Sequence, residues 1–242
     1  MTQPTAVVTG GSAGIGAAIC EEFLVAGYRV INLSRSAPER ADPRLETICV
    51  DLADRDATHR VASELAARAD VTTLVHNAGT IRAALLEEVE LADLDYVNNL
   101  HVAAAIILAQ AFLPAMKAAA FGRIVLIGSR AALGLQRRTS YASSKCAMSG
   151  LARTWALELG QHGITVNCVA PGPIASTEMF HEVVPDGSEK MRRLAEGIPV
   201  RRLGQPGDVA RAVRFMAATE NGYITGQTLM VCGGSSVGSL AL

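Results

Sequence analysis

The segment Ala6-Val7-Val8-Thr9-Gly10-Gly11-Ser12-Ala13-Gly14-Ile15-Gly16 joins a short apolar run to a glycine-rich turn near the start of the chain. The apolar run has the pattern of a buried strand, and the residues from Gly14 onward have the spacing of a helix. A glycine-rich turn between a strand and a helix lets backbone N–H groups approach a phosphate at the positive end of the helix. The segment therefore predicts a βα unit that binds a dinucleotide, with Gly10, Gly14 and Gly16 as its essential glycines. An ordinary βα turn is the alternative interpretation.

The same alternation continues along the chain. Short β-branched runs alternate with longer Ala- and Leu-rich segments of helical spacing, the pattern of repeated βαβ units around a parallel sheet. The predicted fold class is α/β, with a single Rossmann-type, doubly wound parallel β-sheet and helices on both faces. We expect strands at residues 6–9, 29–33, 47–50, 73–76, 123–128, 165–169 and 228–231, helices at 14–26, 54–68, 91–119, 139–161 and 206–218, and helix ends at Gly27, Gly122 and Gly163.

Length, charge and hydropathy bound the class of protein. The 242 residues and 25.3 kDa fit one domain over residues 1–242. Lys and Arg total 22 and Asp and Glu total 23, so no basic surface for nucleic acid or membrane is expected. Residues 1–5 do not resemble a signal peptide, and the longest apolar stretch, residues 102–113, is shorter than the ~20 residues of a membrane helix. A small molecule is the expected partner.

The cysteines indicate the compartment. There are five of them, widely spaced and without metal-type pairs, so neither a disulfide framework nor a metal site is expected. A reducing, cytoplasmic location fits this pattern best.

Residues 171–206 break the alternation of strands and helices. This segment contains five prolines, several charges and a weak helical pattern around residues 188–197. Long irregular segments of this kind are often functional. We therefore expect a lid or loop over the bound substrate.

Tyr141 and Lys145 are four residues apart in an expected helix, which places them on one face as a possible reactive pair. An isolated tyrosine titrates near ~10, and a cation nearby favours its ionised form. Tyr141 is thus a candidate proton donor, activated by Lys145. Ser129 follows an expected strand and would orient a carbonyl oxygen at the carboxyl end of the sheet. The alternative is that Tyr141 is an ordinary helix residue and Ser129 a turn residue.

Together, the glycine-rich turn, Gly128-Ser129 and the segment Tyr141-Ala142-Ser143-Ser144-Lys145 resemble the short-chain dehydrogenase/reductase family, and the resemblance extends from end to end of the chain. It implies an NAD(P)-dependent oxidoreductase that interconverts a ketone and a secondary alcohol by hydride transfer, similar to 3-oxoacyl-[acyl-carrier-protein] reductases. In this resemblance Tyr141 is the general acid/base, and Lys145 also binds the nicotinamide ribose.

The resemblance also implies contacts to the cofactor beyond the glycines. Asp51 and Leu52 match the adenine-contacting segment, although Asp51 could instead be a helix N-cap. His76 replaces the first Asn of the family's Asn-Asn-Ala-Gly segment, and Ser176 competes with Thr177 for one contact. The remaining expected contacts are Ser12, Ile15, Asn77, Ala78, Gly79, Pro171, Gly172, Ile174 and Thr177.

Ser34 and Arg35 stand where an enzyme specific for NAD usually has an acidic residue that binds the ribose hydroxyls. An arginine can pair with the 2′-phosphate of NADP, and no carboxylate is present to repel that phosphate. We therefore expect NADP(H) to be preferred. The alternatives are that Arg35 only solvates a loop, because Ala13 lacks the basic side chain of many NADP-dependent relatives, or that NAD(H) is used.

The family usually has an asparagine on the long helix before the catalytic strand, and counting back along the helix places that position at His101. Asn98 and Asn99 are nearby but out of register. Either the helix is displaced, or His101 serves in the proton relay, since a histidine titrates in a useful range. A packed polar residue without a relay role is the third possibility.

Arg130, Arg137 and Arg138 flank the predicted mouth of the site and could recognise a carboxylate, a phosphate or an acyl-carrier surface, or could simply be solvated. Cys232 stands where relatives often have Asp and has no assigned role.

Other functions and assemblies remain open from the sequence. A NAD(H)-dependent alcohol or sugar dehydrogenase of the same family is one alternative, and a non-catalytic nucleotide sensor is another, although sensors tend to lose the Tyr/Lys pair. The expected helices at residues 91–119 and 139–161 are apolar over much of their circumference, which predicts a homotetramer or homodimer; burial within one subunit is the competing explanation.

Overall fold

Seven parallel strands form the centre of the protein in the computed structural model, which describes residues 3–38, 41–175 and 187–237. The strand order is β3-β2-β1-β4-β5-β6-β7, which confirms the predicted doubly wound sheet. The strands are β1 Thr5–Thr9, β2 Arg29–Ser34, β3 Leu45–Cys49, β4 Val71–His76, β5 Gly122–Ile127, β6 Ile164–Pro171 and β7 Thr228–Val231.

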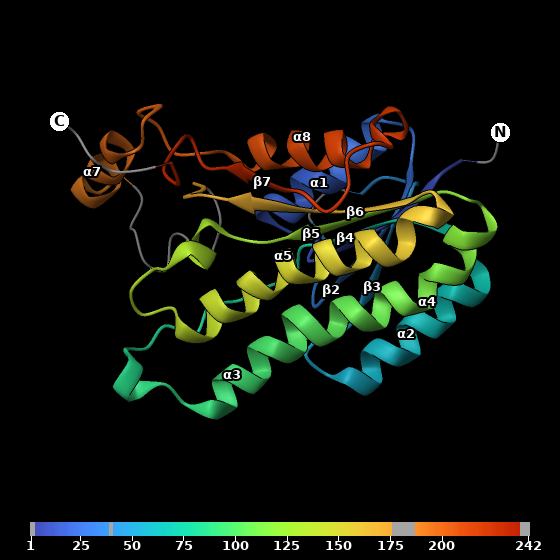
Figure 1. Cartoon of the computed structure of the whole chain (residues 1–242), viewed down its shortest axis with the longest axis horizontal. Helices are drawn as coiled ribbons and strands as arrows, with labels where there is room; N and C mark the ends of the chain where they lie inside the picture. The colour runs from blue at the N-terminus through green and yellow to red at the C-terminus, as the bar shows by residue number, and fades with distance from the viewer. Residues whose placement is uncertain (1–2, 39–40, 176–186, 238–242) are drawn as a thin grey trace.

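Helices cover both faces of this sheet (Figure 1). On one face α1 (Gly14–Val25) packs against α8 (Pro206–Ala217), and on the other lie α2 (Arg55–Arg68), α4 (Ala104–Ala118) and α5 (Thr139–Leu159). Successive residues of β1 divide between the two apolar cores: Val7 joins the α2–α4–α5 side, and Ala6 and Val8 join the α1–α8 side. Because both faces are covered, the central strands are apolar without alternation.

The expected helix at residues 91–119 is interrupted. It consists of α3 (Leu91–Asn98), a π-helical turn (Asn99–Ala103) and α4, which ends at Ala118. The run Leu91–Ala118 is long and apolar enough to cross a membrane by length and composition alone. Half of its most apolar window is buried against the rest of the protein, as in the core helix of a soluble protein. A π-turn of this kind inserts one residue and rotates the side chains that follow it.

Two of the three expected helix-ending glycines occupy left-handed positions, Gly27 with φ 86° and Gly163 with φ 73°. Gly122 was predicted wrongly, because it is the first residue of β5. Ala120, with φ 47°, makes the left-handed turn after α4 instead. Glycine is needed at position 122 for a different reason, because a Cβ there would lie 2.9 Å from the side chains of Ile164 and Met116.

Arg123 ties several segments together at the amino edge of the sheet. Its guanidinium is buried and donates hydrogen bonds to four backbone carbonyls, those of Gly122, Gly163, Ala218 and Thr219, at 2.9–3.3 Å. Ala218 caps the end of α8, where a positive charge is favourable. A single side chain therefore fastens α8, β5 and the turn before β6.

The predicted weak helix near residue 190 is present as α7 (Glu189–Gly197), beyond the carboxyl edge of the sheet (Figure 1). Ser188 caps it by accepting a hydrogen bond from the backbone N–H of Met191 at 3.2 Å. Ala175, Ile198 and Leu203 form a small apolar cluster under the helix.

Candidate active site

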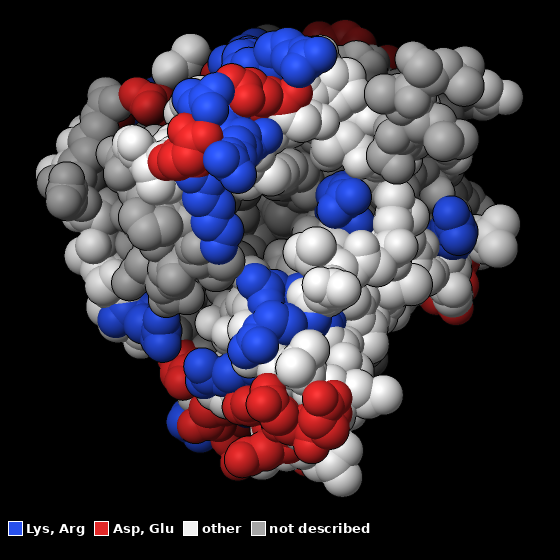
Figure 2. Space-filling model, turned by 90° about the vertical axis from the view of Figure 1, so that its left-hand side faces the viewer, with Lys and Arg blue, Asp and Glu red and all other residues white. Residues whose placement is uncertain are grey.

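The strand order reverses next to β1, which has β2 on one side and β4 on the other. The loops that leave the carboxyl ends of these strands diverge there and leave a crevice, the usual ligand site of an open α/β sheet. Figure 2 views this edge and shows basic side chains around a hollow.

The glycine-rich turn has the geometry of a phosphate cradle. Gly10 and Gly14 have left-handed φ angles of 67° and 52°, and Ile15 lies in the first turn of α1. A Cβ on Gly16 would lie 1.9 Å from the carbonyl oxygen of Gly10, so only glycine fits. Ala13 precedes α1 and offers no side chain to cap it. The first N–H groups of α1 are thus available to an anion, and these residues fit a dinucleotide pyrophosphate.

Thr9 joins this turn to the loop after β4. Its Oγ1 accepts hydrogen bonds from the backbone N–H groups of Asn77 and Ala78, both at 2.9 Å. The Asn77 amide in turn donates to the carbonyls of Thr9 and Gly10 at 3.1 and 3.2 Å. Asn77 and Ala78 therefore lie beside the cradle. Their contact with the cofactor, and that of Gly79, stays a prediction.

Asn32, which the sequence analysis missed, organises the region expected to hold the adenosine ribose. It is fully buried in β2, where its Oδ1 accepts from the Gly11 N–H and the Ser34 hydroxyl, each at 2.7 Å. Its Nδ2 donates to Ser12 Oγ at 3.0 Å. A polar residue inside an otherwise apolar parallel strand was the signal that could have revealed it. Arg35, the residue after Ser34, is exposed.

Asp51 lies after β3, but it is not the cap of α2, so that alternative was wrong. Asp54 caps the helix by accepting from the Ala57 N–H at 2.9 Å, whereas Asp51 accepts from the Ala53 N–H in the preceding turn, also at 2.9 Å. Leu52 is buried beneath them.

Tyr141 and Ser129 meet at the carboxyl edge of β5. Ser129 follows the strand, and Tyr141 lies in the first turn of α5 with 8% of its surface exposed. Burial raises the pKa of the Tyr141 phenol above its usual value. Hydrogen bonding with Ser129 and the positive charge of Arg138 partly lower that pKa. The pair can hold and transfer a proton at a site shielded from water.

Lys145 lies one turn further along α5 and is 3% exposed. Its Nζ donates to the carbonyl oxygen of Ile127 at 2.8 Å and is 5.8 Å from the centroid of the Tyr141 ring. Burial lowers the pKa of Lys145 to about 8. The positive charge found to lower the pKa of Tyr141 is that of Arg138. The expectation that Lys145 also lowers this pKa stays a prediction.

His101 lies inside the π-turn and is completely buried. Its Nε2 accepts a hydrogen bond from the Thr80 N–H at 3.1 Å, so the neutral ring carries its proton on Nδ1, which lies 2.8 Å from Ser144 Oγ. Ser144 in turn donates to the carbonyl of Tyr141. Burial, followed by the charge of Lys145, holds the pKa of His101 well below its ordinary range. This geometry favours a packed neutral histidine over one that titrates near neutral pH.

His76 is a second buried histidine beside the π-turn. Its Nδ1 lies 3.2 Å from Thr9 Oγ1, and its Nε2 has no hydrogen-bond partner among the described residues. Burial and the charge of Lys145 lower its pKa to about 3. Both positions where the resemblance led us to expect an Asn, 76 and 101, hold a buried histidine whose pKa is lowered.

The loop after β6 closes the crevice. Pro171 ends the strand, the Gly172 N–H donates to the Val231 carbonyl at 2.9 Å, and Ile174 is buried. A Cβ on Gly172 would lie 2.7 Å from that of Cys232, whose Sγ lies 3.1 Å from Ser236 Oγ. Thr177 and Ser176 lie outside the described residues.

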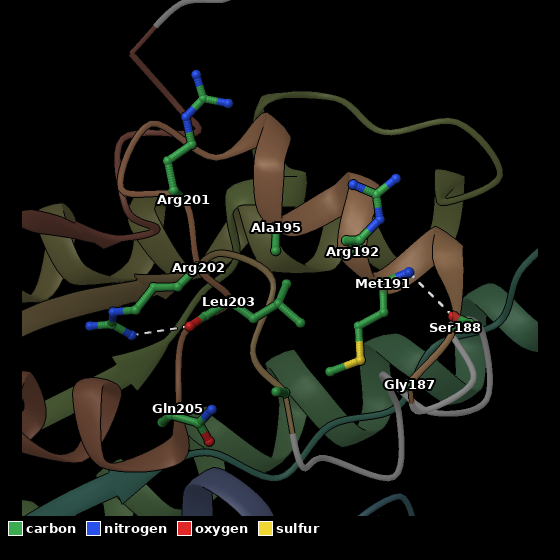
Figure 3. A pocket seen from close by; sticks show the side chains of 10 residues that line it. Gly187, Ser188, Met191, Arg192, Ala195, Arg201, Arg202, Leu203 and Gln205 are labelled. Carbon is green, nitrogen blue, oxygen red and sulfur yellow. Dashed lines mark hydrogen bonds between the residues drawn. The ribbon is translucent and has the colours of Figure 1, made fainter.

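A separate cavity of about 430 Å³ lies beneath α7, lined by its residues Met191, Arg192 and Ala195 and by 201–203 (Figure 3). Neither Ser129, Tyr141 nor Lys145 lines it. This cavity is therefore separate from the cluster that contains Ser129, Tyr141 and Lys145.

A phosphate cradle and a buried proton donor that face one crevice are what hydride transfer to or from a nicotinamide dinucleotide requires. Fold and site together define an NAD(P)-dependent oxidoreductase.

Comparison with known proteins gives the family. A family model described as Enoyl-(Acyl carrier protein) reductase matches residues 10–236. The (2S)-[(R)-hydroxy(phenyl)methyl]succinyl-CoA dehydrogenase subunit BbsD of Thauera aromatica is 34% identical, over 96% of both chains. The 3-oxoacyl-[acyl-carrier-protein] reductase of Haemophilus influenzae is 35% identical, over 97% of this chain and 98% of that one. The chain belongs to the short-chain dehydrogenase/reductase family.

A solved structure from Beutenbergia cavernae, assigned as an NAD(P)-dependent gluconate 5-dehydrogenase with NADP bound at low occupancy, is also similar. It superimposes with a TM-score of 0.87 at 35% identity, covering 98% of each chain. The family resemblance predicted from the sequence is confirmed.

Proposed function

We propose that the protein interconverts a ketone and a secondary alcohol, with NADP(H) as the preferred cofactor and Tyr141 as the general acid/base. The observation that carries this proposal is the buried contact between Tyr141 and Ser129 beside Lys145, at the crevice that the phosphate cradle enters.

The reaction divides between cofactor and protein. The bound nicotinamide supplies the hydride in reduction and accepts it in oxidation. In reduction, Tyr141 gives its hydroxyl proton to the carbonyl oxygen, and Ser129 donates a hydrogen bond to the same oxygen as negative charge develops there. Because burial raises the pKa of the phenol, Tyr141 holds its proton at neutral pH until the transfer. Lys145 supplies a hydrogen-bond donor toward the nicotinamide ribose.

Preference for NADP(H) rests on Arg35. Its side chain is exposed next to the buried Asn32–Ser34 pair, and among the described residues it has no ion-pair partner. A 2′-phosphate would supply that partner, whereas the ribose of NAD would not. Use of NAD(H) by an alcohol or sugar dehydrogenase of this family is the alternative.

Three further features belong to this proposal. Residues 171–206, which include α7, act as the substrate lid. All five cysteines are free, in keeping with a cytoplasmic enzyme.

Exposed apolar side chains lie on two separate faces: Leu157 of α5 on one, and Phe215 and Tyr223 near α8 on the other. Two such faces support a homotetramer, and light scattering after size exclusion would test it.

A spectrophotometric screen tests the function. NADPH and NADH are each followed with ketones, 3-oxoacyl and enoyl thioesters, alcohols and sugars. We expect turnover of ketones, faster with NADPH, and loss of turnover in Tyr141→Phe with unchanged cofactor affinity. Reduction of enoyl thioesters alone would contradict the ketone chemistry. Tight cofactor binding without any turnover would favour the nucleotide-sensing alternative.

A further inference from the structure

We propose that Arg138 binds a carboxylate of the substrate, so that the protein acts on oxo acids and hydroxy acids whose anionic group lies within a few bonds of the reacting carbon. This inference rests on the proposed function, because it places the substrate at Tyr141.

The first observation is a buried cation without a counter-ion. Arg138 is 9% exposed, and the hydrogen bond found for its side chain runs from Nη1 to the carbonyl oxygen of Arg137 at 3.0 Å. Among residues 3–38, 41–175 and 187–237, no carboxylate lies within ion-pair distance of it. The buried side-chain nitrogens and oxygens without a partner in the described part of the chain do not include those of Arg138, so its other N–H donors still reach solvent. A largely covered guanidinium without a counter-ion gives up part of its hydration, and an anion bound there would offset that loss.

Other arginines show what satisfied ones look like in this protein. Arg123 is also buried, but it donates to four backbone carbonyls and thereby holds the fold together. On α7, Arg192 pairs with Glu189 and Glu196. Arg138 has neither arrangement. A guanidinium has five N–H donors, so most of the donors of Arg138 can exchange water for a ligand.

The second observation is the position of Arg138. It is the N-cap of α5, three residues before Tyr141, with φ −132° and ψ 28°, and its charge acts on the Tyr141 phenol. An anion bound by its guanidinium would therefore lie near the carbonyl that Tyr141 protonates.

The neighbouring arginines do not compete for this role. Arg137 is exposed to solvent, and Arg130 is partly exposed and donates from Nε to the Ser235 carbonyl at 3.3 Å. A carboxylate fits the fork of Arg138 through two parallel hydrogen bonds. The bound carboxylate would also neutralise Arg138, whose positive charge lowers the pKa of Tyr141. The phenol would then keep its proton until hydride transfer.

The test compares acids with their neutral esters. Wild type, Arg138→Gln, Arg138→Lys and the exposed control Arg137→Gln are assayed with 3-oxobutanoate, 4-oxopentanoate and the methyl ester of each. Wild type is expected to prefer the acids in kcat/KM. Arg138→Gln is expected to lower the acid-to-ester ratio about 10- to 100-fold, the range for a charged hydrogen-bonded pair, with Arg138→Lys in between and Arg137→Gln unchanged.

Two further measurements separate recognition from a structural role. Because Arg138 has no ion-pair partner among the described residues, Arg138→Gln should keep or raise the melting temperature. Because the charge that lowers the pKa of Tyr141 is lost, the basic limb of the pH–rate profile with the esters should move to higher pH. A large fall in melting temperature with an equal loss of activity on acids and esters would overturn the proposal. The proposal would also be overturned if wild type turned over acids and esters equally well and if both stabilised its NADP complex equally against heat.

Failure of the proposed function would look different. Turnover of the neutral esters that disappears in Tyr141→Phe supports the ketone chemistry whatever the outcome at Arg138. No turnover of acids or esters with either cofactor contradicts that chemistry, and the thermal stabilisation of the cofactor complex by acids over esters then still decides the carboxylate site.

Discussion

The backbone N–H of Thr80 donates a 3.1 Å hydrogen bond to Nε2 of His101, and this bond fixes the tautomer of a histidine that is completely buried. A proton on Nε2 would break it. His101 and its neighbour His76 are therefore neutral in the folded protein, with the positive charge of Lys145 nearby disfavouring ionisation of both. The π-turn and the end of β4 thus bring two uncharged imidazoles near Lys145.

These two histidines should make the fold sensitive to acid. In the unfolded chain each titrates near 6.5, whereas the folded-state pKa is lowered to about 3 for His76 and well below 6.5 for His101. The unfolded state therefore binds more protons below pH 6.5, and stability is lost as pH falls from about 6.5 toward the folded-state values. We expect His76 to lower the free energy of unfolding by about 2 kcal/mol between pH 7 and pH 5, and His101 to act in the same direction. Urea denaturation across that range measures it.

His101→Asn should weaken this pH dependence, and exposed His59 gives the matched control, since His59→Asn should leave it unchanged. In the same variant the pH–rate profile between pH 6 and 9 should keep its shape, because neutral His101 does not titrate there. A limb that disappears in His101→Asn would instead assign His101 to the proton relay.

Lys145 should make cofactor binding dependent on pH. Its pKa in the free protein is lowered to about 8, so its ammonium is lost as pH rises through that value. The dissociation constant of NADPH, measured by fluorescence titration, should therefore rise above pH 8, by at most about tenfold per pH unit. Lys145→Met should bind more weakly and without this pH dependence. Constant wild-type affinity between pH 7 and 9.5 would contradict the assignment.

Gly16 should tolerate no side chain. A Cβ would lie 1.9 Å from the Gly10 carbonyl oxygen and 2.7 Å from the Asn77 amide nitrogen. We expect Gly16→Ala to lower the free energy of unfolding by about 1–3 kcal/mol, the usual cost of overpacking, and to weaken cofactor binding. Gly150 in α5 is the control, because a Cβ there meets nothing within 4 Å. Gly150→Ala should raise the free energy of unfolding by about 0.5–1 kcal/mol. Equal effects of the two changes would disprove the steric argument.

Arg35→Asp should reverse the cofactor preference. The change removes the cation proposed to bind the 2′-phosphate and introduces a carboxylate that repels it, while the same carboxylate can accept from the ribose hydroxyls of NAD. We expect kcat/KM for NADPH to fall by about 100-fold and that for NADH to stay equal or rise. Arg60→Asp, an exposed change on α2, controls for net charge. An unchanged NADPH/NADH ratio would leave Arg35 as a solvated loop residue.

The sequence was most informative where a residue type is dictated by local geometry. Gly10, Gly14 and Gly16 could be predicted because left-handed backbone and close approach admit only glycine, and the parallel sheet because its strands are apolar throughout. The end of α4 was predicted to within one residue, but Gly122 was wrongly taken as its glycine stop, because Ala120, an L residue, occupies the left-handed turn.

Features set by packing could not be predicted. The π-turn changes the register of a long helix without any sequence signal, and the burial of Arg138 depends on how α5 begins beside the loop at Ala84, which pairs with it. The polar Asn32 inside the apolar strand β2 was a visible signal, but its four hydrogen-bond partners come from three separate segments that only the fold brings together.

The buried guanidinium of Arg123, which donates to four backbone carbonyls, lies at the amino edge of the sheet, opposite the carboxyl edge that bears Tyr141 and the residues around it. The contacts that hold the helices on the sheet and the proposed substrate site are therefore at opposite edges of the sheet. Loops at the carboxyl edge can change in length or sequence while the hydrogen bonds of Arg123 continue to hold the helices on the sheet. A fold arranged in this way can accept new substrates without losing its stability.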